Sequence, residues 1–113
     1  MADRILTWYF ENIDRDGTEQ GPAYYMDADY VPSAIRVLAR RVADAGNLTF
    51  DIKDDGVTIL ARRGALVKGD ASEPDAEEFP HNPATILADS VVTLDVTPSG
   101  AKGITVHLEL DKA

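Results

Sequence analysis

Residues 48–61 constrain the fold of this chain more than any other stretch. Leu48-Thr-Phe-Asp-Ile-Lys53 alternates apolar and polar side chains, which is the period of a β-strand with one buried face. Asp54-Asp55-Gly56 then supplies turn residues, because glycine adopts positive φ without a steric cost and aspartate tolerates it better than most residues. Alternation resumes over Val57–Ala61. The pattern predicts a β-hairpin.

The preceding segment, Ala34–Ala43, admits two interpretations. Its Ala, Leu and Arg residues favour a helix, with Ser33 as a possible N-cap and Gly46-Asn47 as a C-cap. Read as a strand, the segment buries every second residue and turns the others outward. The inward set is Ile35, Val37 and Ala39; the outward set is Arg36, Leu38 and Arg40. Intrinsic propensity is a weak prior that tertiary contacts often override, so the local pattern leaves both interpretations open.

Several other segments have the β-branched and aromatic composition of strands. They are Ile5–Phe10, Ala23–Tyr30, a short edge strand at Ala65–Val67, Ala84–Leu87, Val91–Val96 and Ile104–Leu110. Val31-Pro32 predicts a bend, since proline cannot donate to a β-ladder. The spacing indicates an all-β fold: one antiparallel β-sandwich domain over residues 1–113, jelly-roll-like, with about seven or eight strands. A long acidic connection covers residues 68–83.

The first predicted strand, Ile5–Phe10, carries apolar bulk on both faces. Leu6, Trp8 and Phe10 share one side, and Ile5, Thr7 and Tyr9 share the other. Two explanations remain open: a neighbouring chain covers the second face, or this is a central strand partly covered by loops.

Charge and composition exclude several classes of partner. The 113 residues include 11 basic and 20 acidic ones, a net charge of −9, which repels phosphate backbones and anionic lipid. No apolar run approaches the about 20 residues that a membrane helix needs, and the N-terminus lacks the apolar core of a secretion signal. The chain has no cysteine, hence no disulfide or thiolate metal site. We expect neither nucleic acid nor membrane as a partner.

The sequence offers no constellation typical of an enzyme. Only His81 and His107 could serve as imidazole bases, and no nucleophile-elbow motif accompanies them. Asp14-x-Asp16-Gly17 begins like a calcium loop, but Tyr25 stands at the twelfth position, where that loop needs Glu. A zinc site needs three or four ligands, and His81 with Glu77 and Glu78 is a weak candidate. We expect no enzymatic activity, no cofactor and no metal.

Two groups of motifs follow one another along the chain. The first comprises a strand, a Gly-containing loop, an "L-x-V-D-I"-like strand, an Asp-Gly turn and an "x-S/T-I-hydrophobic" strand. Here these are Ile35–Ala43, Asp44–Gly46, Leu48–Ile52, Asp55-Gly56 and Val57–Leu60. The second comprises a "D-x-V/L-T-hydrophobic-D-V" strand, another Gly loop and a "hydrophobic-T-V-x-L" strand. Here these are Asp89–Val96, Pro98–Gly103 and Ile104–Leu110.

This arrangement, over Val31–Leu110, resembles a small β-domain of tailed-phage virion proteins, found in both head and tail. The chain departs from that family in the two arginines of its first matching strand and in the acidity of residues 68–83. The resemblance favours a strand over Ala34–Ala43. It implies a virion structural role without catalytic residues, and does not choose between head and tail.

Within this virion role, the single domain without a secretion signal or catalytic group favours a capsid-decoration or head-associated protein, located in the virion after assembly in the host cytoplasm. Its partners would be the major capsid protein or another virion protein, together with further copies of itself in a trimer or pentamer. The negative charge suits the outer surface of a shell, away from packaged DNA. Candidate interface residues are Trp8, Tyr9, Arg36, Arg40, Arg41, Arg62, Arg63 and Phe79.

The arginine candidates have two interpretations: they are solvated, or they pair with acids on a neighbouring copy. Those acids would be Asp70, Glu73, Asp75, Glu77 and Glu78, and such binding would weaken as salt rises. Phe79 either folds back onto the core or anchors a contact. The alternative function is a tail-tip or fibre module that binds a host glycan through exposed aromatic residues. Its candidates are Trp8, Tyr9, Tyr24, Tyr25 and Tyr30, unless they pack in the core.

Overall fold

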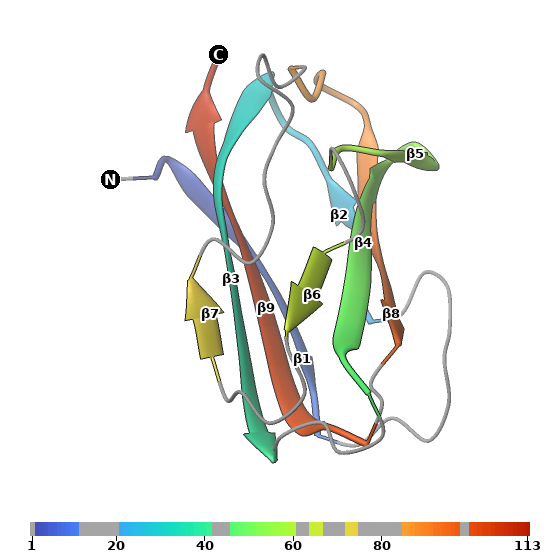
Figure 1. The fold of residues 1–113 in the computed structure, drawn as a ribbon. Coiled ribbons are helices and arrows are strands. Elements are labelled where there is room, and N and C mark those ends of the chain that lie inside the picture. The colour runs from blue at the N-terminus through green and yellow to red at the C-terminus, as the bar shows by residue number, and fades with distance from the viewer. Residues whose placement is uncertain are drawn as a thin grey trace.

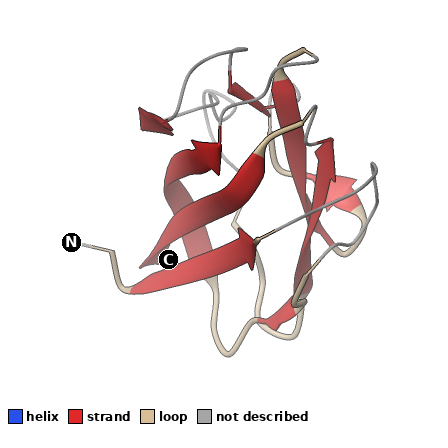
Figure 2. Ribbon diagram, turned by 90° about the horizontal axis from the view of Figure 1, so that it is seen from below, coloured by secondary structure: helices blue, strands red, loops and turns tan. Residues whose placement is uncertain are grey.

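The computed structural model describes residues 2–11, 21–41, 46–60, 64–66, 72–74, 85–97 and 100–113, with the backbone alone for 64–66 and 72–74. All regular structure in these ranges is β, as predicted (Figure 2). The strands are β1 (Arg4–Phe10), β2 (Tyr24–Tyr25), β3 (Tyr30–Arg41), β4 (Leu48–Asp54), β5 (Val57–Thr58), β6 (Gly64–Leu66), β7 (Ser72–Pro74), β8 (Val91–Thr97) and β9 (Lys102–Lys112).

The strands form two antiparallel sheets that face each other (Figure 1). The first sheet has the order β1-β9-β3-β7. The second sheet has the order β2-β8-β4-β5, with β6 also paired to β4. The predicted antiparallel β-sandwich is therefore confirmed.

The strand pairs are nested, and this nesting defines the topology. β1 pairs with β9, β2 with β8, β3 with β7, and β4 with both β5 and β6. Successive pairs alternate between the two sheets, so the chain is one long hairpin rolled around a common core. Because β5 and β6 share one edge of β4, the sheets have four strand positions each, which is the arrangement of a jelly roll.

The β4–β5 hairpin, at the innermost fold of this roll, has the predicted turn. Asp55 has a φ of 49° and Gly56 a φ of 86°, the two consecutive positive values of a type I′ turn. The Asp55 carboxylate also accepts a hydrogen bond of 2.8 Å from the backbone N–H of Val91, on β8. The Asp55 side chain thus attaches the turn of this hairpin to β8, the other neighbour of β4.

Residues 34–41 belong to a strand, not to a helix. β3 pairs with β9 from Tyr30 to Arg41, and its inward residues Ile35 and Val37 are fully buried. A helix here would leave the central strand β9 unpaired along the edge opposite β1, so the ladder overrides the helical propensity of the segment. This is the strand interpretation that the resemblance favoured.

Four predictions about strands and their boundaries differ from the structure. The segment 23–30 pairs only at Tyr24–Tyr25, although burial still alternates through Met26. Pro32 does not end a strand, because a register shift between Pro32 and Ala34 lets β3 continue past it. Residues 84–87 form no strand in the described part, only an isolated bridge between Ile86 and Tyr30. The edge strand predicted at 65–67 is β6, one residue earlier.

The core lies between the sheets and takes alternate residues from each long strand. Trp8, Phe50 and Leu108 are among its largest fully buried side chains. The inward set predicted for the last strand is confirmed. That set is Ile104, Val106, Leu108 and Leu110.

Candidate interaction surface

The outer face of the first sheet combines apolar and charged side chains in a register that the strand pairing defines. β1 contributes Ile5, Thr7 and Tyr9; β9 contributes Thr105, His107 and Glu109; β3 contributes Arg36, Leu38 and Arg40. Tyr9 and Leu38 both lie opposite Thr105, so the three form one row across the sheet. Ile5, Glu109 and Ala34 form a second row in the same way.

Apolar side chains on this face are open to solvent. Ile5 is 52% exposed, Tyr9 54% and Leu38 48%. Each stands at an outward position of its strand, where a half-buried strand normally carries polar residues. An apolar patch on a sheet face marks a site of contact with another molecule more often than a lone exposed residue does.

Two ion pairs flank these apolar residues and hold the arginines against the sheet. Arg36 Nε lies 2.8 Å from Glu109 Oε2, between β3 and β9. Arg40 pairs with Glu11, just beyond β1, and Glu11 also accepts a hydrogen bond from the Tyr9 hydroxyl. This hydrogen bond raises the pKa of Tyr9 above its usual value. Acidic side chains of the same chain therefore balance the charges of Arg36 and Arg40.

Gly103 makes the Arg40–Glu11 pair possible. Its N–H donates to the Glu11 carbonyl at 3.0 Å, and its φ of +60° lies in the left-handed region. A β-carbon on Gly103 would come within 2.7 Å of the Arg40 β-carbon. The arginine side chain thus crosses β9 at the one position where no side chain obstructs it.

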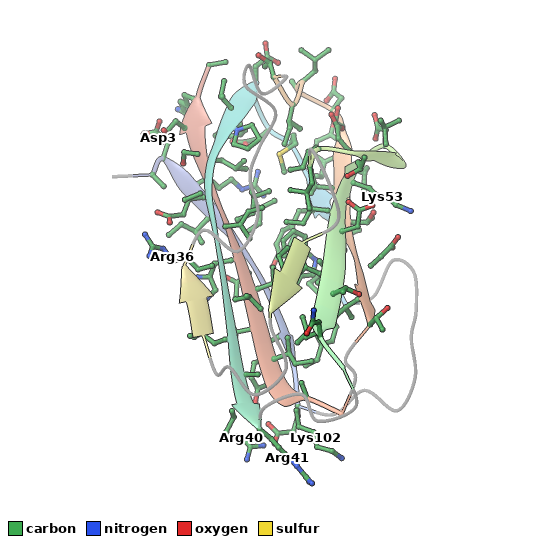
Figure 3. The ribbon with its side chains drawn as sticks, in the orientation of Figure 1. Asp3, Arg36, Arg40, Arg41, Lys53 and Lys102 are labelled. Atoms are coloured by element: carbon green, nitrogen blue, oxygen red, sulfur yellow. The ribbon has the colours of Figure 1, made fainter. Side chains whose placement is uncertain are left out.

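Arg41 and Lys102 lie beside Arg40 at one end of the molecule (Figure 3). Arg41 and Lys102 are register partners in the β3–β9 ladder, at the point where β3 ends and β9 begins. The structure therefore gathers three of the predicted candidates, Arg36, Arg40 and Arg41, on one strand, but only Arg36 and Arg40 stand on the outer face of the sheet.

Trp8 was predicted as an interface residue, but its side chain is fully buried, so it is not part of this surface. Its indole N–H donates to the Pro22 carbonyl at 2.7 Å, and its ring packs edge-on against Tyr24 with 5.3 Å between centroids. Trp8 faces inward from β1, and Tyr9 faces outward. β1 is also an edge strand, not a central one, so its outer face is exposed rather than covered by loops.

Several predicted residues lie outside the described part of the chain: Arg62, Arg63, Phe79, His81, and the acids Asp70, Asp75, Glu77 and Glu78. The strand that contains Glu73, β7, is described, and its backbone pairs with β3 opposite Val37. Part of the acidic connection thus runs beside the arginine strand of the same chain, where the sequence suggested an acid of a neighbouring copy.

The aromatic residues expected to form a glycan platform do not share one surface. Tyr30 is buried, and Tyr24 donates its hydroxyl to the Thr7 carbonyl. Tyr25 is 59% exposed but lies on the second sheet, whereas Tyr9 lies on the first. The Tyr25 hydroxyl donates to Asp89, which raises the pKa of Tyr25.

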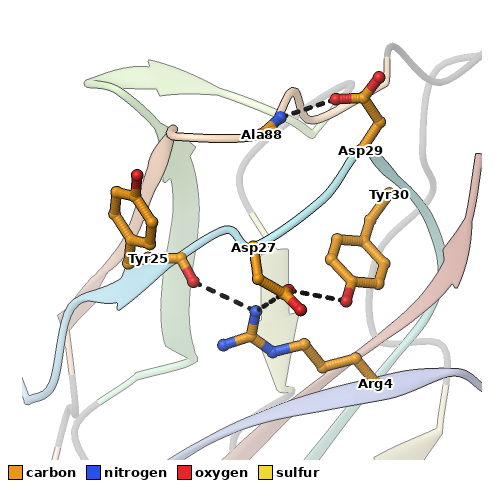
Figure 4. A network of polar contacts seen from close by, with 6 residues as sticks. All are labelled: Arg4, Tyr25, Asp27, Asp29, Tyr30 and Ala88. Carbon is orange, nitrogen blue, oxygen red and sulfur yellow. Dashed lines mark hydrogen bonds and ion pairs between the residues drawn. The ribbon is translucent and has the colours of Figure 1, made fainter.

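Arg4 on β1 and Tyr30 on β3 both contact Asp27, which lies in the connection between β2 and β3 (Figure 4). The Tyr30 hydroxyl donates to Asp27 Oδ1 at 2.8 Å, and Arg4 Nη1 donates to the same oxygen at 3.0 Å. The Tyr30 hydrogen bond, an interaction with the backbone of Asp27 itself and the Arg4 charge together lower the pKa of Asp27, against a smaller opposing effect of burial. Arg4 also donates to the Tyr25 carbonyl, and Asp29 accepts from the Ala88 N–H.

The outer face of the second sheet is polar in the middle of β4 and β8, and it exposes Val91 and Tyr25 where β8 pairs with β2. Lys53 Nζ lies 2.7 Å from Asp95 Oδ2, and the Thr58 hydroxyl donates to Asp51. Asp51 and Asp95 are directly opposite each other in the ladder, so Lys53 balances the charge of one of two facing carboxylates. Both outer faces therefore expose apolar side chains: the first at Ile5, Tyr9 and Leu38, and the second at one end, where β2 pairs with β8.

Neither a metal site nor a membrane helix is found among the described residues. No group of three or more His, Asp or Glu side chains is placed there to bind a metal ion, and His107 stands outward on β9 between Thr7 and Arg36. The same part of the chain contains no helix with the length and hydropathy to cross a bilayer.

Comparisons with known proteins identify no family. No family model matches the sequence, and no curated protein matches it significantly. Among solved structures, the crystal structure of PirA aligns with 96% of this chain and 95% of its own, at 10% identity and a TM-score of 0.43. A structure of infectious bursal disease virus, Gt strain, aligns at 17% identity and a TM-score of 0.31; the chain covers 32% of it. Both likenesses are too distant to assign a function.

Two residues of this surface, Ile5 and Leu38, were absent from the predicted interface set. Their signal was present in the sequence, since each is a large apolar residue at an outward position of an alternating strand. Assigning these two residues to an interaction surface also requires the tertiary structure, in which nothing in the described part of the chain covers that side of the first sheet.

Proposed function

We propose that this chain is a non-enzymatic structural subunit of a phage virion, of the capsid-decoration type, which assembles through the outer face of the first sheet. The observation that carries this proposal is the exposure of Ile5, Tyr9 and Leu38 on one sheet face. A docking function needs accessible apolar side chains together with polar groups, and this face has both. The similarity of residues 31–110 to virion domains supports the viral context, and jelly rolls are a common architecture of capsid and lectin domains.

The fold by itself does not select this function, because jelly rolls serve several. A glycan-binding module is the alternative, and the separation of Tyr9 and Tyr25 on different sheets counts against a shared aromatic platform. Catalysis would require a nucleophile, base and orienting group in contact. The polar contacts described above instead join sheets, turns and strand ends.

The test is incorporation into particles. Phage carrying wild-type, Leu38→Glu or Val57→Glu chain would be purified, and the copies of the chain per particle counted by quantitative mass spectrometry. Val57 is the matched control, since it is 69% exposed on the second sheet. We expect copy numbers comparable with those of the shell subunit for wild type and Val57→Glu, and a large loss for Leu38→Glu. Absence of wild-type chain from particles would overturn the proposal.

A further inference from the structure

We infer that the partner on this face is a second copy of the chain, packed face to face across a twofold axis parallel to β9. The inference rests on the proposed function only in using the same surface. Its basis is the register of the first sheet together with the distribution of charge.

The register makes the face complementary to itself. Tyr9 on β1 and Leu38 on β3 lie at equal heights on either side of Thr105, on the central strand β9. A twofold rotation about an axis along β9 exchanges the positions of β1 and β3. It therefore sets Tyr9 of one copy over Leu38 of the other, and the reverse, as an isologous interface requires.

The second row follows the same rule. Ile5 and Ala34 both flank Glu109, so the same rotation places Ile5 of one copy over Ala34 of the other. Apolar side chains then meet apolar side chains at the outer positions of both rows, while Thr105 and Glu109, which is paired with Arg36, meet their own counterparts at the axis. The strands of the two facing sheets would run nearly parallel in direction, as in aligned sheet packing about 10 Å apart.

The distribution of charge favours this face for contact between two copies. Each chain carries a net charge of −9, so random approach is repulsive. On the outer face of the first sheet, Arg36 and Arg40 are balanced by Glu109 and Glu11. Because these charges balance, this partly apolar face opposes the approach of a second acidic copy less than an acidic surface would. The Cα extents of the chain, 38 by 23 by 22 Å, allow a sheet face to approach the about 800 Å² per partner of a standard interface.

This arrangement predicts the opposite salt dependence from intermolecular arginine–acid pairing. Since the arginines are already paired within each chain, salt would mainly screen the repulsion between two copies of charge −9. Association should tighten as ionic strength rises. Pairing between arginines of one copy and acids of the next would instead weaken.

Sedimentation equilibrium of the purified chain over a range of concentration and salt tests the inference. We expect a dimer for wild type and for the control Val57→Glu, and at least about tenfold weaker association for Leu38→Glu and Tyr9→Glu. Circular dichroism of each variant checks that it is folded. A wild-type monomer at high concentration, a trimer or pentamer, or equal weakening by Val57→Glu would overturn the twofold dimer.

Cross-linking tests the position of the axis. The chain has no cysteine, so a single introduced thiol is specific. Thr105→Cys would place two thiols across the axis, and a short bis-maleimide should join the copies, whereas Val57→Cys should remain uncross-linked at the same concentration. The reverse pattern would contradict the geometry. A wild-type monomer that still enters particles would overturn this inference and leave the proposed function standing.

Discussion

Gly103 and Arg40 approach so closely that a β-carbon on Gly103 would lie 2.7 Å from the β-carbon of Arg40. The arginine therefore crosses β9 and reaches Glu11 only because position 103 has no side chain. This contact links all three strands β1, β9 and β3 at one end of the first sheet. It also neutralises the arginine on the face that we propose for assembly.

Replacement of Gly103 by alanine should therefore destabilise the protein more than replacement of Gly56. At Gly56, with φ of +86° and nothing within 4 Å of an added β-carbon, the cost is backbone strain alone, about 1–2 kcal/mol. At Gly103 steric overlap with Arg40 adds a further about 1–3 kcal/mol. Urea denaturation of Gly103→Ala and Gly56→Ala measures both losses. Equal losses would show that the Arg40 contact relaxes freely.

Trp8 and Tyr9 are adjacent in sequence but should differ strongly on truncation. Trp8→Ala leaves a cavity in the core and an unpaired Pro22 carbonyl, at a cost of about 3–5 kcal/mol in the free energy of unfolding. Tyr9→Ala removes an exposed side chain and should change it by about 0.5 kcal/mol in dilute solution. Because Trp8 is buried, its native fluorescence emission should also be blue-shifted, and since it is the only tryptophan the signal belongs to it alone. Comparable costs for the two variants would contradict the inward orientation of Trp8.

The ionisation of Asp27 should contribute to stability above about pH 4. Its pKa is lower in the folded chain than the ordinary value of 3.8, so the folded state retains the charge while the unfolded state takes up a proton. Stability from this group is present above the unfolded pKa and is lost as pH falls through the folded value. Carboxyl NMR titration should find the Asp27 pKa below 3.8 in wild type and closer to it in Tyr30→Phe. Tyr25→Phe, which removes a hydroxyl bound to Asp89, should leave it unchanged.

Lys53 should stabilise the second sheet by neutralising Asp95, which faces Asp51 across the ladder. Lys53→Met leaves two facing carboxylates, one of them with a side chain only 9% exposed, and should cost about 1–3 kcal/mol. Adding Asp95→Leu removes the buried charge and should restore part of the loss. Thermal denaturation of the single and double variants measures this coupling, and additive effects would show that the two side chains act independently.

Much of the fold could be predicted from local sequence because its elements alternate clearly. The Leu48–Asp54 strand, the Asp55-Gly56 turn and the inward residues of the last strand follow from a period of two and from the φ that glycine allows. The Ala34–Ala43 segment could not be decided in this way. Its composition favours a helix, and pairing with β9 over the core is what makes it a strand.

The candidate surface was likewise predictable in part from local sequence and in part only from the tertiary structure. Alternation by itself determined that Arg36, Leu38 and Arg40 share one side of a strand and that Tyr9 opposes Trp8. Only the tertiary structure decided that Tyr9 and Leu38 stand in one row on an open face, and that the arginines find their acids within the chain. The physical reason is that strand period is a property of neighbouring residues. Strand order, register and exposure depend instead on contacts between segments far apart in the sequence.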